Sequence, residues 1–298
     1  MNTKIAIVTS FIFTTIGLLI ILVFSFNKQF NDGSGILNTT LANDFGSFIG
    51  GIVGPIFSLS AFLLVYATLT EQQKTFQLQK FEGRLFELLR YHRENVNLMK
   101  MRVPSQKEMT VEGYRVFIEM KKQFEELYKI SNEFDIENKI EEKYKIKLAY
   151  SILFYGVGVA TLPALNETIK DIDSEFSKKV IAKCRERKAE YNSNTTYHGG
   201  NQSRLGHYFR NISQIVQYID DANFLTIHDK YQYVKMLRTQ FTQYELAIFF
   251  YNSFSERGKS WTKNGWIKTY KLIKNIPENF LENINPKDYF DFKYEHEE

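Results

Sequence analysis

The segment that decides the fold is DFGSFIGGIVGPIFSLSAFLLVYATLTE, which occupies residues 44–71. Residues 45–70 carry no charge, and this run exceeds the roughly 20 apolar residues that are needed to cross the core of a bilayer. The sequence therefore predicts a membrane-spanning helix here. Gly46, Gly50 and Gly54 recur every four residues, so they share one face of the predicted helix and would let another helix approach closely.

An earlier apolar run predicts a first membrane-spanning helix. Residues 5–26 carry no charge and are rich in Ile, Leu, Phe and Val. A cleaved signal peptide is the competing interpretation, but its apolar core is about 7–15 residues long and precedes a small-residue cleavage site. The run is longer than that and ends in bulky side chains. We therefore expect an uncleaved transmembrane hairpin in residues 1–70, in which the polar, turn-rich residues 27–43 connect the two spans.

Basic residues near the predicted spans indicate the orientation of the hairpin. Lys28 is the only basic residue in the connector, whereas Lys4 precedes the first span. Four more basic residues follow the second span, at Lys74, Lys80, Arg84 and Arg90. Because Lys and Arg near the ends of spans favour the cytoplasmic side, both termini are predicted to be cytoplasmic.

The remaining chain predicts an all-α cytoplasmic domain over residues 71–278, followed by a polar and loosely attached C-terminal tail over residues 279–298. Residues 71–102 contain no proline, so the second span is predicted to continue as a helix out of the membrane. Its apolar positions recur every three or four residues, at Leu78, Phe81, Leu85, Leu88, His92, Val96 and Met99. This seam favours packing in a domain core over a parallel dimeric stalk, because it lasts only about three heptads.

Helical spacing of apolar residues continues to the end of this domain, and no strand alternation is evident. The uncharged run 148–165 could be a third span, but its glycines, its proline and the basic sequence beyond it favour a buried helix. The segment 192–203, NSNTTYHGGNQS, predicts a loop. The other predicted helices occupy residues 111–130, 167–191, 204–220, 230–254 and 261–276.

Composition and motifs argue against several classes of protein. The net charge of +4, from 38 basic and 34 acidic residues, does not indicate nucleic acid as a partner. Cys184 is the only cysteine, so an internal disulfide and a cysteine metal motif are both excluded. The sequence has no phosphate-binding Gly-Lys-Ser loop, no H-E-x-x-H and no G-x-S-x-G motif. We expect no metal and no cofactor.

Two polar clusters interrupt apolar helix faces and are candidates for function. His92 lies on the seam in FELLRYHRENVNLM, where it could share a ligand with Asn95 or serve as a core histidine. His207, Tyr208 and Arg210 follow a glycine-containing loop at a predicted helix start, where anions are favoured. Arg210 could bind a phosphate there or pair with an acid.

Glu245 is the acid most interesting for function, because the apolar residues that follow it predict burial. A buried carboxylate needs a partner, which Arg210, Arg238 or a histidine could supply. An enzymatic site would require His92, His207, Arg210 and Glu245 to converge in the fold. The sequence alone leaves that convergence open.

Several motifs, taken in order, resemble the AbiC-like family of phage abortive infection proteins. They are FGSFIGGIVGPIFSLSAFLL, FELLRYHRENV, GHYFRNISQIVQYID and LRTQFTQYELAIFFYN, followed by residues 266–276. The resemblance covers nearly the whole chain and implies a bacterial membrane protein that limits phage propagation. It does not imply an active site. Its recurrent polar residues correspond here to His92, Asn95, Tyr208, Arg210, Glu245, Tyr251 and Asn252.

These observations lead to one main hypothesis and one alternative. The first is an anti-phage protein of the bacterial inner membrane, whose cytoplasmic helical domain senses infection or acts as effector without catalysis. Its expected partners are the lipid bilayer, further copies of the chain through the glycine face, and a phage or host protein as trigger. The alternative is a membrane-tethered nuclease or nucleotide-binding effector that uses His92, His207, Arg210 and Glu245.

Overall fold

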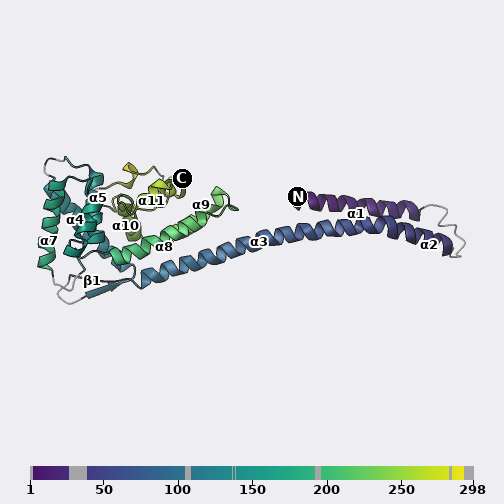
Figure 1. The fold of residues 1–298 in the computed structure, drawn as a ribbon, viewed down its shortest axis with the longest axis horizontal. Coiled ribbons are helices and arrows are strands. Elements are labelled where there is room, and N and C mark those ends of the chain that lie inside the picture. The colour runs from purple at the N-terminus through teal and green to yellow at the C-terminus, as the bar shows by residue number, and fades with distance from the viewer. Residues whose placement is uncertain are drawn as a thin grey trace. The chain divides into compact units, whose positions relative to one another are not determined.

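The computed structural model describes residues 3–26, 39–104, 109–135, 137, 139–191, 196–281 and 284–291. The described chain is mostly helical and divides into two compact units, residues 1–84 and residues 85–298 (Figure 1). Most of the predicted connector, and parts of the predicted loop and tail, lie outside the described residues.

The first unit is built from two antiparallel helical segments. Helix α1 (Thr3–Ser25) lies beside a second segment composed of α2 (Thr39–Phe48), the π-helix η1 (Ile49–Val53) and the beginning of α3 (Gly54–Asn97).

Small and polar side chains join the two segments. The Ser10 hydroxyl donates to the Ser60 carbonyl oxygen over 2.9 Å, and the hydroxyls of Thr14 and Ser60 are 2.7 Å apart. Gly17 lies so close to Phe57 that a β-carbon on it would come within 2.5 Å of the ring. A glycine of α1 therefore makes room for a ring of the second segment, as in the small-residue packing that apolar helices favour.

The glycine-rich face of the second segment is interrupted by the π-helix. Pro55 has no N–H to offer the carbonyl of Gly51, so a regular α-helix cannot continue through this turn. The N–H of Gly54 instead reaches back five residues to Ile49. β-Carbons added at Gly46 and Gly50 would meet no described atom within 4 Å, so neither glycine packs against α1.

Both segments have the length and composition required to cross a membrane. The helices are Lys4–Val23 and Asn43–Asn97, and their most apolar stretches of 18 residues have mean hydropathies of 2.6 and 2.2. Only 17% of each of these stretches is buried within the structure. Large apolar side chains such as Phe11 and Phe62 are consequently exposed.

Helix α3 continues without interruption from the apolar segment into the second unit, as the sequence predicts. Within that unit the seam residues Leu85, His92, Val96 and Met99 are all buried. This part of the predicted seam therefore packs as core.

A short hairpin follows α3 and was not predicted from the sequence. Strand β1 (Lys100–Val103) pairs antiparallel with β2 (Met109–Glu112), with Met101 opposite Val111. Strands of four residues are too short to show a clear alternation of apolar and polar side chains.

Helices form the rest of the second unit, around a core centred on α4, α5 and α10. The uncharged run 148–165 is not one helix, because α5 ends where Gly156 adopts a positive φ of 76°. Its α5 part is buried on all sides, as expected for a core helix. The elements after β2 are α4 (Arg115–Phe134), α5 (Glu142–Tyr155), η2 (Val159–Thr161), α6 (Leu162–Thr168), α7 (Ser174–Glu190), α8 (Gln202–Asp220), α9 (Ile227–Arg238), α10 (Gln243–Ser253), α11 (Lys259–Lys263), α12 (Trp266–Tyr270) and η3 (Pro286–Asp288).

Two helices predicted as continuous are each divided in two. Residues 230–254 fall in α9 and α10, because Thr242 and Glu245 form a capping box that begins a new helix. Of residues 261–276, only 261–263 and 266–270 are helical, in α11 and α12, and Gly265 between them is left-handed, with a φ of 71°. Apolar spacing alone did not reveal either interruption.

The C-terminal segment packs more tightly than expected for a loosely attached tail. Ile284 is buried, and the Tyr289 hydroxyl donates to Glu142 at the start of α5. The ring of Phe290 contacts that of Phe250 on α10, with centroids 6.1 Å apart. Aromatic contacts therefore hold the described part of the segment in place, although its polar composition did not predict them.

Candidate functional site

The predicted site residues of α8 are divided between two faces of the helix. Tyr208 is buried in the domain interior, whereas His207 and Arg210 are exposed. Neighbouring residues on a helix point about 100° apart, and residues three apart share a face. The motif GHYFRN therefore places some of its side chains in the core and others on the surface.

His92, Tyr208 and Glu245 form a buried cluster between α3, α8 and α10. The rings of His92 and Tyr208 have centroids 5.2 Å apart, and the Tyr208 hydroxyl donates to Glu245 Oε1 over 3.1 Å. The other oxygen, Oε2, accepts from the Thr242 N–H over 2.9 Å. The partners of Glu245 are thus a tyrosine and its own capping box. Arg238 instead donates to the Lys271 carbonyl over 2.8 Å.

Burial shifts the ionisation of this cluster toward neutral forms. It lowers the pKa of His92 to about 4, and neither ring nitrogen has a hydrogen-bond partner in the described chain. Burial also raises the pKa of Glu245. Asn95 is exposed, so it does not share a ligand with the buried His92 ring. His92 behaves as a neutral core side chain with unsatisfied nitrogens.

Asn252 and Tyr251 on α10 are also interior residues. The Asn252 amide donates to the Tyr150 hydroxyl over 2.8 Å and accepts from Trp261 Nε1 over 3.1 Å. Tyr251 stacks on Phe124 of α4, with centroids 3.5 Å apart. Both residues connect α10 to neighbouring elements, and this accounts for polar groups at fully buried positions.

The exposed face of α8 lines two adjoining hollows, which we call the α8 groove. They share Gly206 and Arg210 and have volumes of about 480 Å³ and 500 Å³. Residues that line only the first hollow are Tyr155, Thr161, Gly199, Gly200, Gln202, Ser203 and His207. Residues that line only the second are Phe154, Leu205, Phe209, Ser213, Gln214, Gln217, Asn252, Arg257, Ser260 and Trp261.

Gly200, which lines the first hollow, is in close contact with Gly156 at the end of α5. Gly156 and Gly200 have positive φ values of 76° and 91°. A β-carbon on Gly200 would come within 2.5 Å of the backbone carbonyl oxygen of Tyr155. Backbone hydrogen bonds seal the contact, since the Asn201 N–H donates to Phe154 O over 2.8 Å. The loop before α8 is thereby fixed against the end of α5.

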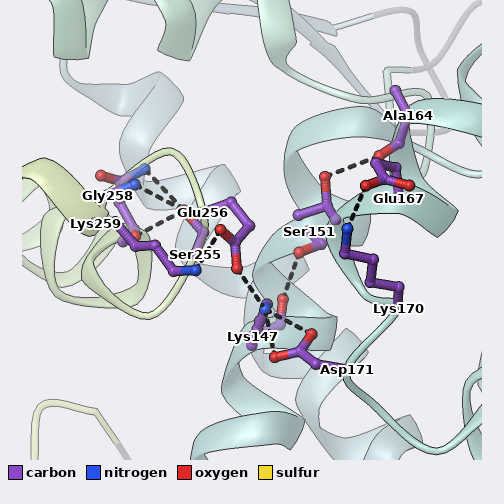
Figure 2. A network of polar contacts seen from close by, with 12 residues as sticks. Lys147, Ser151, Ala164, Glu167, Lys170, Asp171, Ser255, Glu256, Gly258 and Lys259 are labelled. Atoms are coloured by element: carbon purple, nitrogen blue, oxygen red, sulfur yellow. Dashed lines mark hydrogen bonds and ion pairs between the residues drawn. The ribbon is translucent and has the colours of Figure 1, made fainter.

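An ion-pair network on α5 fixes the loop that carries Arg257. Figure 2 shows the buried Lys147 between Asp171 and Glu256, at 2.7 Å and 3.0 Å. Lys259 also pairs with Glu256, over 2.5 Å. Together these contacts place Glu256 beside α5 and leave the next residue, Arg257, at the groove.

Arg257 is in turn fixed on the α5 side. Its Nε donates to the Tyr155 hydroxyl over 3.1 Å. The next residue must be a glycine, because a β-carbon on Gly258 would lie 2.0 Å from the backbone carbonyl oxygen of Asn252. The arginine therefore has a defined position at the mouth of the second hollow.

The groove is cationic. Arg210 and His207 have no hydrogen-bond or ion-pair partner among the residues that the structure describes. Among the residues that the structure describes, no Asp or Glu lines either hollow. Such a surface suits an anionic ligand, because unpaired arginines bind carboxylates and phosphates through paired N–H groups.

Comparison with known proteins identifies the segment that builds this groove. Residues 200–281 match the family described as "putative phage abortive infection protein". The match supports the resemblance to AbiC-like proteins that the sequence motifs indicate, and it covers the motifs that lie in residues 200–281. No curated protein and no solved structure matched the chain.

The matched segment contains α8 to α12 and therefore both groove arginines. It also contains Tyr208, Glu245 and Asn252, which hold these helices together. Most side chains that line the α8 groove thus come from the part of the chain that carries the family signature. The matched segment thus contains both the side chains that line the groove and the buried residues that hold its helices in place.

The four residues considered for an enzymatic site do not come together in the structure. His92 and Glu245 are buried, each only 2% exposed, whereas His207 and Arg210 lie on the outer face of α8. Sequence reasoning did not identify Arg257, Tyr155 or Gly200 as groove residues. The paired Gly199 and Gly200, directly before α8, were the available signal, since adjacent glycines often permit close backbone contacts.

Replacing Gly200 by alanine is expected to lower the free energy of unfolding by about 2 kcal/mol or more. A residue with a β-carbon loses roughly 1–2 kcal/mol of stability at a positive φ. The overlap of that β-carbon with the Tyr155 carbonyl oxygen lowers the stability further. Chemical denaturation of the purified protein, followed by tryptophan fluorescence, measures this change.

The matched control for Gly200→Ala is Gly83→Ala on α3, where a β-carbon would meet no described atom within 4 Å. Because alanine favours helices over glycine, this variant should be unchanged or more stable by up to about 1 kcal/mol. Equal stability of the two variants would contradict the close-contact explanation.

Proposed function

We propose that this protein is a membrane-anchored anti-phage defence protein of the abortive infection type. The observation that carries the proposal is the family match over residues 200–281. In this proposal residues 1–70 form a transmembrane hairpin in the bacterial cytoplasmic membrane, with both termini in the cytoplasm. The helical domain senses infection or acts as effector.

The exposed apolar surface of the first unit supports the membrane anchor. Two helical segments of sufficient length pack antiparallel through Ser10, Thr14 and Ser60, while their large apolar side chains face outward. Hydroxyl contacts inside and apolar side chains outside are typical of helices in lipid. The basic residues that follow the second span support its orientation.

The continuous α3 helix suggests how the proposed membrane anchor is connected to the helical domain. It begins in the apolar segment and ends at Asn97, and its final turns are buried in the core of the second unit through Leu85, Leu89 and His92. In this proposal, a change of association in the membrane reaches the helical domain through this one continuous helix. We propose that association through the glycine face of α2 and η1 changes the membrane or recruits a partner.

A non-enzymatic mechanism accords best with the positions of the polar residues. His92 and Glu245 serve the interior, and Glu245 is occupied by Tyr208 and Thr242. A nuclease that uses these residues together with His207 and Arg210 would need both helix faces to act on one substrate.

Plaque assays on cells that express the protein, with a broad panel of phages, test the proposal. Cells with the full-length chain should give fewer or smaller plaques for at least one phage than cells with an empty vector. Unchanged phage yield across the panel, with the protein present in the membrane fraction, would overturn the proposed function.

Replacing Gly50 and Gly54 by leucine is expected to abolish protection while the protein still inserts into the membrane. Leucine side chains would occupy a face that is open around Gly50, where a β-carbon would meet no described atom within 4 Å, and would keep another helix away. The measurement is plaque number together with the amount of protein in membranes. Ala61→Leu, at an exposed position of the same helix, is the control and should keep protection. A fully protective Gly50/Gly54 double variant would argue against association through this face.

A further inference from the structure

We propose that the α8 groove is an oxyanion site, in which Arg210 and Arg257 bind a phosphoryl or carboxylate group of a small ligand. Arg210 comes from α8 and Arg257 from the loop between α10 and α11, and both line the second hollow. The family description names no ligand. The site goes beyond the proposed function and does not depend on it, because ligand binding is measured without phage.

A buried tyrosine connects the two arginines. Tyr155 is only 4% exposed, and its hydroxyl accepts from Arg257 Nε over 3.1 Å. Arg210 shares the first hollow with Tyr155 and the second hollow with Arg257. The two guanidinium groups therefore belong to one site, at the place where the hollows adjoin.

Both guanidinium groups keep N–H donors for a ligand. Arg257 uses Nε for Tyr155, and its two terminal nitrogens have no hydrogen-bond partner in the described chain. Arg210 has no such partner on any of its nitrogens. Parallel N–H groups of a guanidinium group match two oxygens of one carboxylate or phosphoryl group, and these charge-assisted bonds are strong.

No acid competes with a ligand for these donors. The acid next to Arg257, Glu256, is bound by Lys147 over 3.0 Å and by Lys259 over 2.5 Å. The described residues that line the two hollows include no other acid. A cleft lined by charge of one sign concentrates the electric field and attracts ions of opposite charge. Arg210 and Arg257 consequently form a positive site without a counter-charge of its own.

Positive charge also reaches the rim of the first hollow. A β-carbon on Gly158 would lie 3.9 Å from Lys188 Nζ and 3.7 Å from Thr161 Oγ1. Thr161 lines the first hollow, so the Lys188 ammonium group lies near it. Lys188 has no ion-pair partner within the described ranges. It therefore adds a further cation on the side of the groove opposite in sequence to Arg257.

The beginning of α8 contributes backbone donors to the same hollow. Gln202 and Ser203, in its first turn, line the hollow. The side chain of Asn201, at the N-cap, accepts no hydrogen bond from this turn, and its amide donates to the Leu153 carbonyl oxygen over 3.1 Å. The first N–H groups of a helix have no acceptor within that helix, and the helix dipole is positive at this end. This helix start supports the arginines as a source of positive potential.

Charge and size define the class of ligand. Because several cations surround the groove, an oxyanion with two or more negative charges should bind more tightly than a monovalent ion such as chloride. Each hollow, at about 480 Å³ or 500 Å³, lies within the range of roughly 300–1,000 Å³ that is typical of small-molecule sites. The phosphoryl or carboxylate group can thus belong to a small organic molecule.

Calorimetry on the full-length protein in detergent tests the proposal, with pyrophosphate and citrate as separate probes and with sodium chloride to keep the ionic strength constant. We expect at least one probe to bind at one site per chain, and the tighter probe distinguishes phosphoryl from carboxylate ligands. Arg210→Gln and Arg257→Gln should each raise the dissociation constant by about tenfold or more. Lys178→Gln removes the same charge from an exposed position of α7 and should leave binding unchanged.

A Tyr155→Phe variant separates a built site from a diffuse positive surface. The variant keeps every charge, but it removes the hydroxyl that holds Arg257 Nε. Since Tyr155 acts by positioning Arg257, we expect the dissociation constant of the bound probe to rise by about threefold or more. A diffuse surface would bind the probe equally well with either side chain.

Three results would overturn the proposal. They are no binding of either probe, binding that both arginine variants retain, and binding that Tyr155→Phe leaves unchanged. Circular dichroism verifies that the variants fold, which the exposed positions of both arginines favour. A wild-type protein that binds a probe and never protects against phage would reject only the proposed function. A protein that protects and binds neither probe would reject only the oxyanion site.

Discussion

Replacing Asn252 by leucine is expected to lower the free energy of unfolding by roughly 4 kcal/mol, because at least two buried polar groups lose their partners. Asn252 is fully buried, and its amide connects Tyr150 on α5 with Trp261 on α11. Each buried donor or acceptor left without a partner costs about 1–3 kcal/mol. Leucine is similar in size, so the loss reports on hydrogen bonding more than on volume.

Chemical denaturation in detergent, followed by far-ultraviolet circular dichroism, measures the effect of Asn252→Leu. Tryptophan fluorescence gives a second signal, because Trp261 is a direct partner of Asn252. The control is Asn95→Leu, the same substitution at an exposed position of α3. It should change stability by no more than about 0.5 kcal/mol. Similar losses in the two variants would show that the buried amide contacts contribute little.

Stability is also expected to fall by up to roughly 3 kcal/mol between pH 6.5 and pH 4 because of His92. Burial lowers the pKa of this histidine from 6.5 to about 4 in the folded protein. In the unfolded chain His92 takes up a proton below pH 6.5, whereas the folded chain resists it until about pH 4. Protons therefore favour the unfolded state in this window, and stability decreases as the pH falls.

A His92→Phe variant isolates this contribution. The neighbouring Glu245 has a raised pKa, so its effect has the opposite sign and remains in both proteins. The difference in unfolding free energy between His92→Phe and the wild type should thus grow as the pH falls from 6.5 to 4. At pH 7 the variant should already be more stable by about 1 kcal/mol, since it lacks the two unpaired ring nitrogens. A difference that is independent of pH would refute the buried, neutral state of His92.

The sequence predicts elements well where one local pattern determines them. The uncharged runs 5–26 and 45–70 coincide with the two apolar helical segments. The absence of proline after residue 71 agrees with an unbroken α3. The apolar spacing of 204–220 corresponds closely to α8. In each case the driving force acts within a few turns of one helix, so neighbouring residues contain the information.

Local patterns fail where polar caps or short strands interrupt apolar spacing. The capping box of Thr242 and Glu245 divides a predicted helix. From the sequence, the same glutamate was predicted to be a buried acid that needs a charged partner. Its actual partner, Tyr208, is 37 residues away in the chain. The β1–β2 hairpin is too short for its alternation to be recognised.

The sequence by itself indicated two apolar helical segments, a helical domain and a resemblance to abortive infection proteins, because these depend on composition, spacing and motif order. Only the tertiary structure decided that His207 and Arg210 face outward while Tyr208 and Glu245 face inward. It also decided that Arg257 joins Arg210 at one groove, through Tyr155 on a helix 102 residues earlier in the chain. The physical reason is that such a site is formed by contacts between distant segments, which helical periodicity does not encode.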